Sequence, residues 1–245
     1  MHIDINCDMG EGIGNDEIIM PVITSANIAC GYHAGDEQTI RSTILLAKKH
    51  GVHIGAHPSF DDRENFGRTE MPCPPGEVYH LVYKQLGIFK KIADECEVKI
   101  HHVKPHGALY NMAARDEQMA AAIALAVKDF NSHIILYGLS NSHLVSEAKK
   151  IGLRTKQEVF ADRTYRENGS LTPRSQPNAL IEDEEKAVKQ VLQMVEQKTV
   201  TTVSGKLIPI EAETVCIHGD GKHGVAFAKA IFNALHKPQR HDDTR

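Results

Sequence analysis

The sequence contains no tryptophan, and none of its apolar stretches approaches the roughly 20 residues needed to cross a bilayer. Charge of one sign is not in excess either, because 28 Lys and Arg residues stand against 32 Asp and Glu residues. This balance gives no electrostatic reason to expect nucleic acid or a membrane surface as a partner. Met1-His2-Ile3-Asp4 enters a strand-like pattern without a basic segment before an apolar one, so we expect no secretory signal and a cytoplasmic location.

Cysteine is scarce and irregularly spaced. The five cysteines form neither a disulfide framework nor a paired zinc-knuckle pattern, which favours reduced, buried thiols. Nucleotide-binding motifs are missing too: there is no GxxxxGK[ST], and no GxGxxG follows the first strand-like segment. The GxSxG elbow of serine hydrolases and the HExxH motif of metalloproteases are also absent. Among the thiols, Cys7 is predicted to face outward and Cys216 to lie deep, so water is the expected nucleophile.

Strand-like and helix-like segments alternate along the 245 residues. The expected strands are 1–8, 25–31, 53–57, 99–104, 133–137, 157–161 and 214–218. The expected helices are 37–50, 77–95, 116–130, 142–151, 179–196 and 223–235, the first with Asp36 as its N-cap and Gly51 as its stop. This alternation predicts a parallel sheet with helical crossovers, arranged as a (β/α)7 barrel of the TIM type, with a doubly wound open sheet as the alternative.

We expect one barrel domain over residues 1–236, followed by a polar, disordered tail at 237–245. Two long connections, 58–75 and 163–177, directly follow strands and would lie on the face where barrel enzymes keep their chemistry. Residues 199–211 are typical of a β-hairpin that turns near Ser204-Gly205.

Ionisable side chains follow the inward parity of several strands. Successive strand residues alternate between faces, and the apolar parity should face the helices. The residues of the opposite parity then point toward the barrel axis, and many of them near the strand ends are polar. They are Asp4, Asn6, Asp8, His53, His57, His102, Lys104, His106, Glu158, Asp162, Cys216, His218 and Asp220. Burying so many polar groups is costly unless they pair with one another, bind an ion or serve a reaction. Two explanations are therefore open: an active site, or a hydrogen-bond network whose polar groups satisfy one another.

The residue types allow several kinds of chemistry. Asp8 and Glu11 could act as a general base or bind a cation, while His57, His106 and His218 could move protons or bind metal. Any divalent metal would be expected on Asp8, His57 and His106. Lys104 and Arg163 could hold an oxyanion or a phosphate, or simply pair with Asp162, Asp8 or Asp220.

Six segments of the sequence resemble the motifs of the LamB/YcsF family in order. They are 3–11 (IDINCDMGE), 25–36 (SANIACGYHAGD), 55–60 with 66–68 (GAHPSF and FGR), 102–111 (HVKPHGALYN), 158–163 (EVFADR) and 218–221 (HGDG). The likeness runs from Ile3 to about Leu235. It departs from the family pattern at Glu37, at residues 61–65 and at Thr69, all of which lie in connections.

The resemblance implies a barrel related to polysaccharide deacetylases and the activity of the A subunit of a 5-oxoprolinase. Such a hydrolase opens the cyclic amide of 5-oxoproline to L-glutamate, with ATP as co-substrate used through subunits B and C. Carried over to this sequence, the expected catalytic residues are Asp8, His57, Lys104, His106, Asp162, His218 and Asp220. The expected substrate-binding residues are Asn6, Glu11, Asn27, His33, Arg68 and Arg163. Two other functions stay open: a metal-dependent amidase or deacetylase acting alone, and a non-catalytic subunit that delivers the lactam to its partners.

Overall fold

A computed structural model describes residues 3–218 and 224–236 of the chain, and the predicted tail at 237–245 lies outside this part. Seven parallel strands form a closed barrel in the order β1-β2-β3-β4-β5-β6-β9. Their bounds are β1 Asp4–Met9, β2 Ser25–Ala29, β3 His53–His57, β4 His102–Val103, β5 Ile135–Leu139, β6 Thr155–Phe160 and β9 Thr214–Ile217. The predicted (β/α)7 barrel is confirmed, and the open-sheet alternative is wrong because β9 pairs with both β1 and β6.

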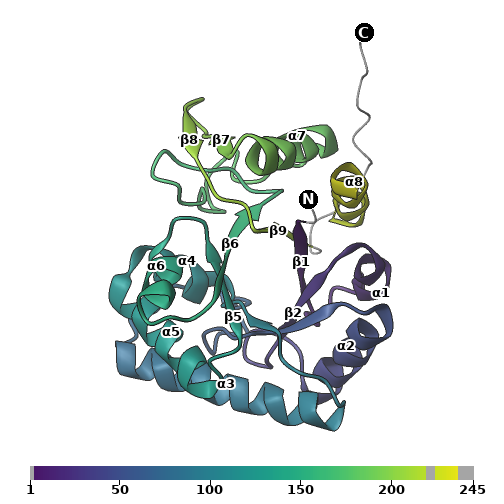
Figure 1. Cartoon of the computed structure of the whole chain (residues 1–245), viewed down its shortest axis with the longest axis vertical. Helices are drawn as coiled ribbons and strands as arrows, with labels where there is room; N and C mark the ends of the chain where they lie inside the picture. Colours follow the sequence, from purple (N-terminus) through teal and green to yellow (C-terminus); the bar gives the residue numbers. More distant parts are fainter. Residues whose placement is uncertain (1–2, 219–223, 237–245) are drawn as a thin grey trace.

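Helices surround the barrel, as Figure 1 shows. They are α1 Asp16–Ile19, α2 Glu37–His50, α3 Pro75–Glu95, α4 Gly107–Arg115, α5 Glu117–Phe130, α6 His143–Lys150, α7 Glu184–Glu196 and α8 Gly224–His236, with a 3-10 turn, η1, at Met20–Val22. None of the helices in the described part is long and apolar enough to cross a membrane. The predicted caps of α2 are confirmed, since Asp36 accepts a hydrogen bond from the Thr39 N–H at 2.8 Å and Gly51 is left-handed with φ 68°.

The core between barrel and helices comes from the outward parity of the strands. Ile5, Cys7 and Val215 are fully buried in it, beside helix residues such as Ile44 and Leu86. Burying this apolar surface is the main stabilising contribution to such a fold. The described cysteines are all free thiols, as the spacing predicted.

Several elements differ from the sequence-based expectation. Helix α7 begins at Glu184 rather than five residues earlier, because the Asp183 side chain caps it and Leu180 pairs instead with Arg163. Strand β4 covers only His102–Val103 rather than 99–104, and Pro105, which has no N–H, stops the ladder on its carboxyl side. Helices α1 and α4 and the η1 turn were not predicted. The hairpin was predicted, and it consists of β7 Thr199–Thr201 and β8 Leu207–Pro209, next to α7 in Figure 1.

Candidate active site

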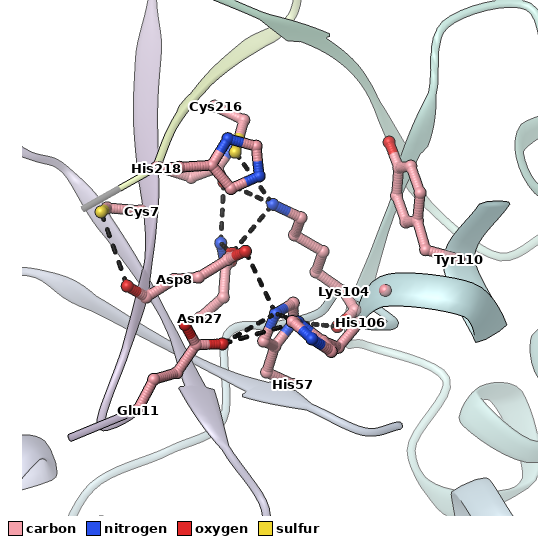
Figure 2. Close-up of polar contacts among 12 residues, drawn as sticks. Cys7, Asp8, Glu11, Asn27, His57, Lys104, His106, Tyr110, Cys216 and His218 are labelled. Atoms are coloured by element: carbon pink, nitrogen blue, oxygen red, sulfur yellow. Dashed lines mark hydrogen bonds and ion pairs between the residues drawn. The ribbon is translucent and has the colours of Figure 1, made fainter. Parts of the chain in front are cut away.

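A buried lysine lies at the centre of the inward-facing polar groups. Lys104 is 2% exposed, and its Nζ lies 3.0 Å from Asp8 Oδ1, 2.9 Å from Glu158 Oε1 and 3.1 Å from Cys216 Sγ. Burial alone would lower the pKa of Lys104, but the Asp8 and Glu158 carboxylates raise it well above its ordinary value. Figure 2 shows Lys104 reaching toward Asp8 and Cys216. A permanent positive charge is therefore held inside the barrel.

Asp8 is oriented by a chain of hydrogen bonds through amide and imidazole groups in the barrel interior. Asn27 donates from Nδ2 to Asp8 Oδ1 at 2.8 Å and to Asn6 Oδ1 at 2.7 Å. The Oδ1 of Asn27 lies 2.8 Å from His102 Nε2, and this ring has room only because residue 55 is glycine. Burial would raise the pKa of Asp8, but His57 and Lys104 hold it well below its usual range. Asp8 thus remains negative.

Three histidines and a glutamate gather beside Asp8, at the ends of neighbouring strands. His33 Nε2 lies 3.0 Å from Glu11 Oε1, and His106 Nδ1 lies 3.5 Å from the same oxygen. His57 Nε2 lies 2.9 Å from His106 Nδ1 and 3.3 Å from Asp8 Oδ2. The rings of His33 and His106 stack with their centroids 3.8 Å apart. Burial lowers the pKa of His106 well below its ordinary value, so that its ring is neutral.

The far nitrogens of two of these rings meet backbone carbonyls. His57 Nδ1 lies 2.6 Å from the Lys104 carbonyl oxygen, and His106 Nε2 lies 2.9 Å from that of Phe66. A tight turn makes the second contact possible: Gly107 has φ 55°, and a Cβ there would lie 2.5 Å from the carbonyl oxygen of Gly67. Both rings are therefore fixed in orientation and tautomer.

An aspartate–histidine pair also lies close to Asp8, since ligand atoms of Asp8, Cys216 and His218 are within 4.8 Å of one another. His218 Nδ1 lies 2.9 Å from both carboxylate oxygens of Asp162, and the His218 ring stacks on Phe160 at 5.6 Å. Burial would raise the pKa of Asp162, but His218 keeps it below its ordinary value. Holding Nδ1–H in this way leaves Nε2 as the atom that can accept or give a proton. Asp220, which the sequence also placed here, lies outside the described residues.

These groups face a cavity of about 830 Å³ at the carboxyl end of the barrel. Asp8, Glu11, His57, Lys104, His106 and His218 belong to its wall. Five arginines also line it, which are Arg68, Arg115, Arg163, Arg166 and Arg174. Arg163 is 5% exposed and donates to the Thr172 carbonyl oxygen; burial and Arg174 lower its pKa to about 10, which leaves it charged at neutral pH. A cavity with this lining suits a small anion.

The structure separates the predicted residues into wall and support. Asn6, Asn27 and His33 lie below the cavity and are not on its wall. Their contacts with Asp8 and Glu11 suit orienting those carboxylates better than touching a ligand. The predicted wall residues Arg68 and Arg163 do line the cavity, in the connections that follow β3 and β6.

Sequence reasoning missed several wall and support residues. Arg166 and Arg174 share the connection after β6 with Arg163, and a count of arginines in that connection would have pointed to them. Tyr110 was also missed; its hydroxyl donates to Glu158 Oε2 at 2.6 Å and so fixes the second carboxylate beside Lys104.

A second polar group occupies the opposite end of the barrel interior. Asp4 Oδ1 accepts hydrogen bonds from the Thr24 and Ser25 hydroxyls, both at 2.7 Å. Asp4 Oδ2 accepts one from the Tyr137 hydroxyl at 3.0 Å and lies 3.4 Å from Lys156 Nζ. We call these five residues the floor network. They contribute nothing to the cavity wall.

The chain is similar over nearly its whole length to several known proteins. A relative from Staphylococcus carnosus, named as the A subunit of 5-oxoprolinase, is 52% identical over 97% of this chain and 96% of the relative. One of the same name from Tolumonas auensis is 50% identical over 95% of each chain. The crystal structure of a lactam utilization protein from Thermus thermophilus has a TM-score of 0.88 at 42% identity, covering 96% of both chains.

A more distant likeness concerns the fold alone. A GH113 β-1,4-mannanase aligns with a TM-score of 0.53 and 11% identity over 97% of this chain and 100% of the mannanase, which again shows a TIM-like barrel. Residues 3–242 match the profile described as the LamB/YcsF family. With that match and the relatives at about half identity, the chain belongs to the LamB/YcsF family.

Proposed function

We propose that the chain is the component of an ATP-dependent 5-oxoprolinase in which the lactam of 5-oxo-L-proline is hydrolysed to L-glutamate. The observation that carries the proposal is the buried Lys104 ammonium at the base of an arginine-lined cavity, facing the Asp162–His218 pair. The names of the relatives, which are 5-oxoprolinase for two of them and lactam utilization protein for the third, support the same substrate class.

ATP is needed because a lactam carbonyl is stabilised by resonance and reacts poorly with water. Transfer of the γ-phosphoryl group to the lactam oxygen gives an O-phosphorylated imidate and ADP. Water then adds to the ring carbon, and cleavage of the C–N bond leaves an amine and an acyl phosphate. A second water converts the acyl phosphate to the carboxylate of glutamate and free phosphate. Two waters and one ATP are thus consumed for each ring opened.

The cavity offers groups for each charge that develops along this route. Lys104 would stabilise the oxygen that becomes negative when the hydroxyl of the tetrahedral adduct loses its proton and the ring nitrogen departs, a contribution typical of a preorganised cation in a buried site. Arg163 and Arg174 would hold the substrate carboxylate or the phosphoryl oxygens, where a planar guanidinium suits both groups.

Proton transfer fits His218 better than Asp8. The sequence alone left Asp8, His57 and His106 as candidate bases. Asp8 is held ionised by His57 and Lys104, which makes its carboxylate a poor proton acceptor. His218 presents Nε2 with Asp162 fixing the other nitrogen, the arrangement of a general acid–base pair. His218 would take a proton from water and return it to the departing ring nitrogen, and Asp8 would keep Lys104 in place.

We assign ATP as co-substrate rather than as a ligand of this chain alone. The sequence has no P-loop and no GxGxxG after its first strand, so activation of the lactam would use subunits B and C as partners. The amidase or deacetylase acting alone is a second candidate, and the Glu11, His57 and His106 cluster favours it.

The test is release of glutamate and ADP from 5-oxoproline and ATP. The chain alone, subunits B and C alone, and all three together would be compared, and the Lys104→Met variant would replace the wild type wherever the chain is present. We expect glutamate and ADP in equal amounts from the complete set, and almost none when Lys104 is replaced. Turnover by B and C without this chain would overturn the proposal in favour of a delivery role. Hydrolysis of amides by the chain alone with a divalent metal would overturn it in favour of the second candidate.

A further inference from the structure

We infer that Glu11, His57 and His106 form a binding site for a divalent transition metal that opens into the cavity. The ligands come from the connections and strand ends that follow β1, β3 and β4, so barrel closure brings them together. Their donor atoms belong to one group within 4.8 Å of one another, which also includes His33. The sequence-based expectation used Asp8 in place of Glu11. The site stands on geometry alone and does not depend on the proposed function.

The hydrogen bonds of the two imidazoles carry the inference. A backbone carbonyl can only accept, so His57 carries its proton on Nδ1, 2.6 Å from the Lys104 oxygen. By the same reasoning His106 carries its proton on Nε2, 2.9 Å from the Phe66 oxygen. When both rings are neutral, the other two nitrogens, His57 Nε2 and His106 Nδ1, turn lone pairs toward each other across 2.9 Å. Two facing lone pairs repel, and either a proton or a metal cation held between them removes the repulsion.

Four features favour a metal as that cation. Glu11 Oε1 supplies a third donor, 3.5 Å from His106 Nδ1 and 3.9 Å from His57 Nε2. Donors bound to one tetrahedral zinc at about 2.0–2.1 Å lie about 3.3–3.5 Å apart, and the three observed separations of 2.9, 3.5 and 3.9 Å bracket this range. Histidine ligands whose far nitrogen donates to a carbonyl are typical of metal centres. Asp8, 3.3 Å from His57 Nε2, adds negative charge beside the site.

His33 has a different part in this arrangement. It does not line the cavity, and its Nε2 lies 3.0 Å from Glu11 Oε1. Its Nδ1 is buried without a hydrogen-bond partner among the described residues. An unpaired lone pair is less costly there than an unpaired N–H, so Nε2–H donates to Glu11 and orients the ligand. Two histidines, one carboxylate and an open position toward the cavity match zinc better than magnesium or calcium.

Metal binding can be measured without any enzymatic readout. The purified chain would be treated with a chelator, then titrated with Zn²⁺ by calorimetry and with Co²⁺ by its visible ligand-field absorption. We expect one equivalent of metal and a Co²⁺ spectrum typical of four-coordinate nitrogen and oxygen ligands. His106→Ala and Glu11→Gln should weaken binding at least about a hundredfold, and His33→Phe, which keeps the stacked ring, about tenfold.

The control is His80→Ala, which removes an exposed histidine on α3 that belongs neither to the cluster nor to the cavity wall. Its affinity should equal that of the wild type. The Glu11→Gln variant keeps the size of the side chain, so we expect it to remain folded. Circular dichroism of each variant would check that any loss of binding does not come from unfolding. The inference is overturned if the wild type takes up no stoichiometric metal. It is equally overturned if His106→Ala and Glu11→Gln, both folded, bind Zn²⁺ as the wild type does.

Discussion

The two ends of the barrel interior are built from similar residues and differ in how their polar groups are satisfied. In the floor network, three hydroxyls and one ammonium converge on the single carboxylate of Asp4, and none of its members reaches the cavity. At the mouth, Lys104 and Asp8 are paired yet belong to the cavity wall, and His57 Nε2 and His106 Nδ1 lie 2.9 Å apart on the same wall.

This difference separates stability from chemistry. A buried polar network that closes on itself can only contribute to the fold, because every donor and acceptor is already used. Groups whose lone pairs or charges face a cavity keep their capacity to bind a ligand. The floor network therefore serves as an internal reference for the mouth: equivalent substitutions at the two ends should change different quantities.

The largest contrast is expected between the two lysines. Lys104→Met should lower the rate of glutamate formation in the complete system about a thousandfold, or about 4 kcal/mol, because it removes the cation that faces the reacting oxygen. Lys156→Met makes the same change at the floor and should leave the rate within about twofold. Steady-state rates per folded molecule, with folding followed by circular dichroism, would check both. A folded Lys104→Met variant that keeps a tenth of the wild-type rate would contradict the predicted difference between Lys104 and Lys156.

The next contrast concerns the Asp162–His218 pair. Asp162→Asn should reduce kcat about a hundredfold, since an amide can hold His218 in the wrong tautomer and no longer stabilises its protonated form. Asp116→Asn is the matched control: Asp116 caps α5 through the Met119 N–H, and asparagine caps equally well. The pH profile of kcat should change in Asp162→Asn and stay the same in the control. An unchanged profile and rate in both would remove His218 from the proposed proton transfer.

At the floor, the expected effect is on stability and its dependence on pH. Burial would raise the pKa of Asp4, but Lys156 and the surrounding hydroxyls lower it from 3.8 to about 2. A carboxyl with a lowered folded-state pKa contributes stability above its unfolded pKa and loses it as pH falls through the folded value. The lowering corresponds to about 2.5 kcal/mol, present above about pH 4 and lost toward about pH 2.

Denaturant unfolding of the wild type and of Asp4→Asn at several pH values isolates this contribution. The wild type should be more stable by about 2.5 kcal/mol at neutral pH, and the two curves should converge near pH 2. The rate per folded molecule should not change at pH 7. A large loss of rate in Asp4→Asn, with stability unaltered, would show that the floor network takes part in the chemistry.

Much of the mouth could be predicted from strand parity alone. Asp8, His57 and Lys104 each follow directly after an apolar residue of opposite parity, and a closed barrel must bring the carboxyl ends of such strands together. The pairing of Lys104 with Asp8 was among the alternatives for the same reason. The alternation of side chains along a strand is a local property, so the inward-facing residues can be predicted without knowing the order of the strands.

The partners across the closing seam could not be predicted. His218 meets Asp162 because β6 and β9 pair in a register that places Phe160 beside Cys216. The hairpin and α7 lie between these strands in the sequence, and no spacing rule sets that register across them. The same limit applies to Arg174, which lies in an exposed part of the connection after β6 and has no periodic pattern around it.

The smallest expected effect lies at the rim of the mouth. Arg174 is exposed and lines the cavity, so it should attract the anionic substrate equally in the ground state and in the transition state. Arg174→Ala should then raise KM for 5-oxoproline about threefold to fivefold with kcat within about twofold, since a solvent-exposed charge interaction contributes at most about 1 kcal/mol. Arg41→Ala, which removes an exposed arginine on α2 that pairs with Glu37 and Glu95, should leave both constants unchanged.

Added salt should shrink the effect of Arg174→Ala on KM, because exposed charges are screened by salt whereas Lys104 is buried. A fall in kcat that persists at high salt would instead place Arg174 with Lys104 among the groups that act on the transition state.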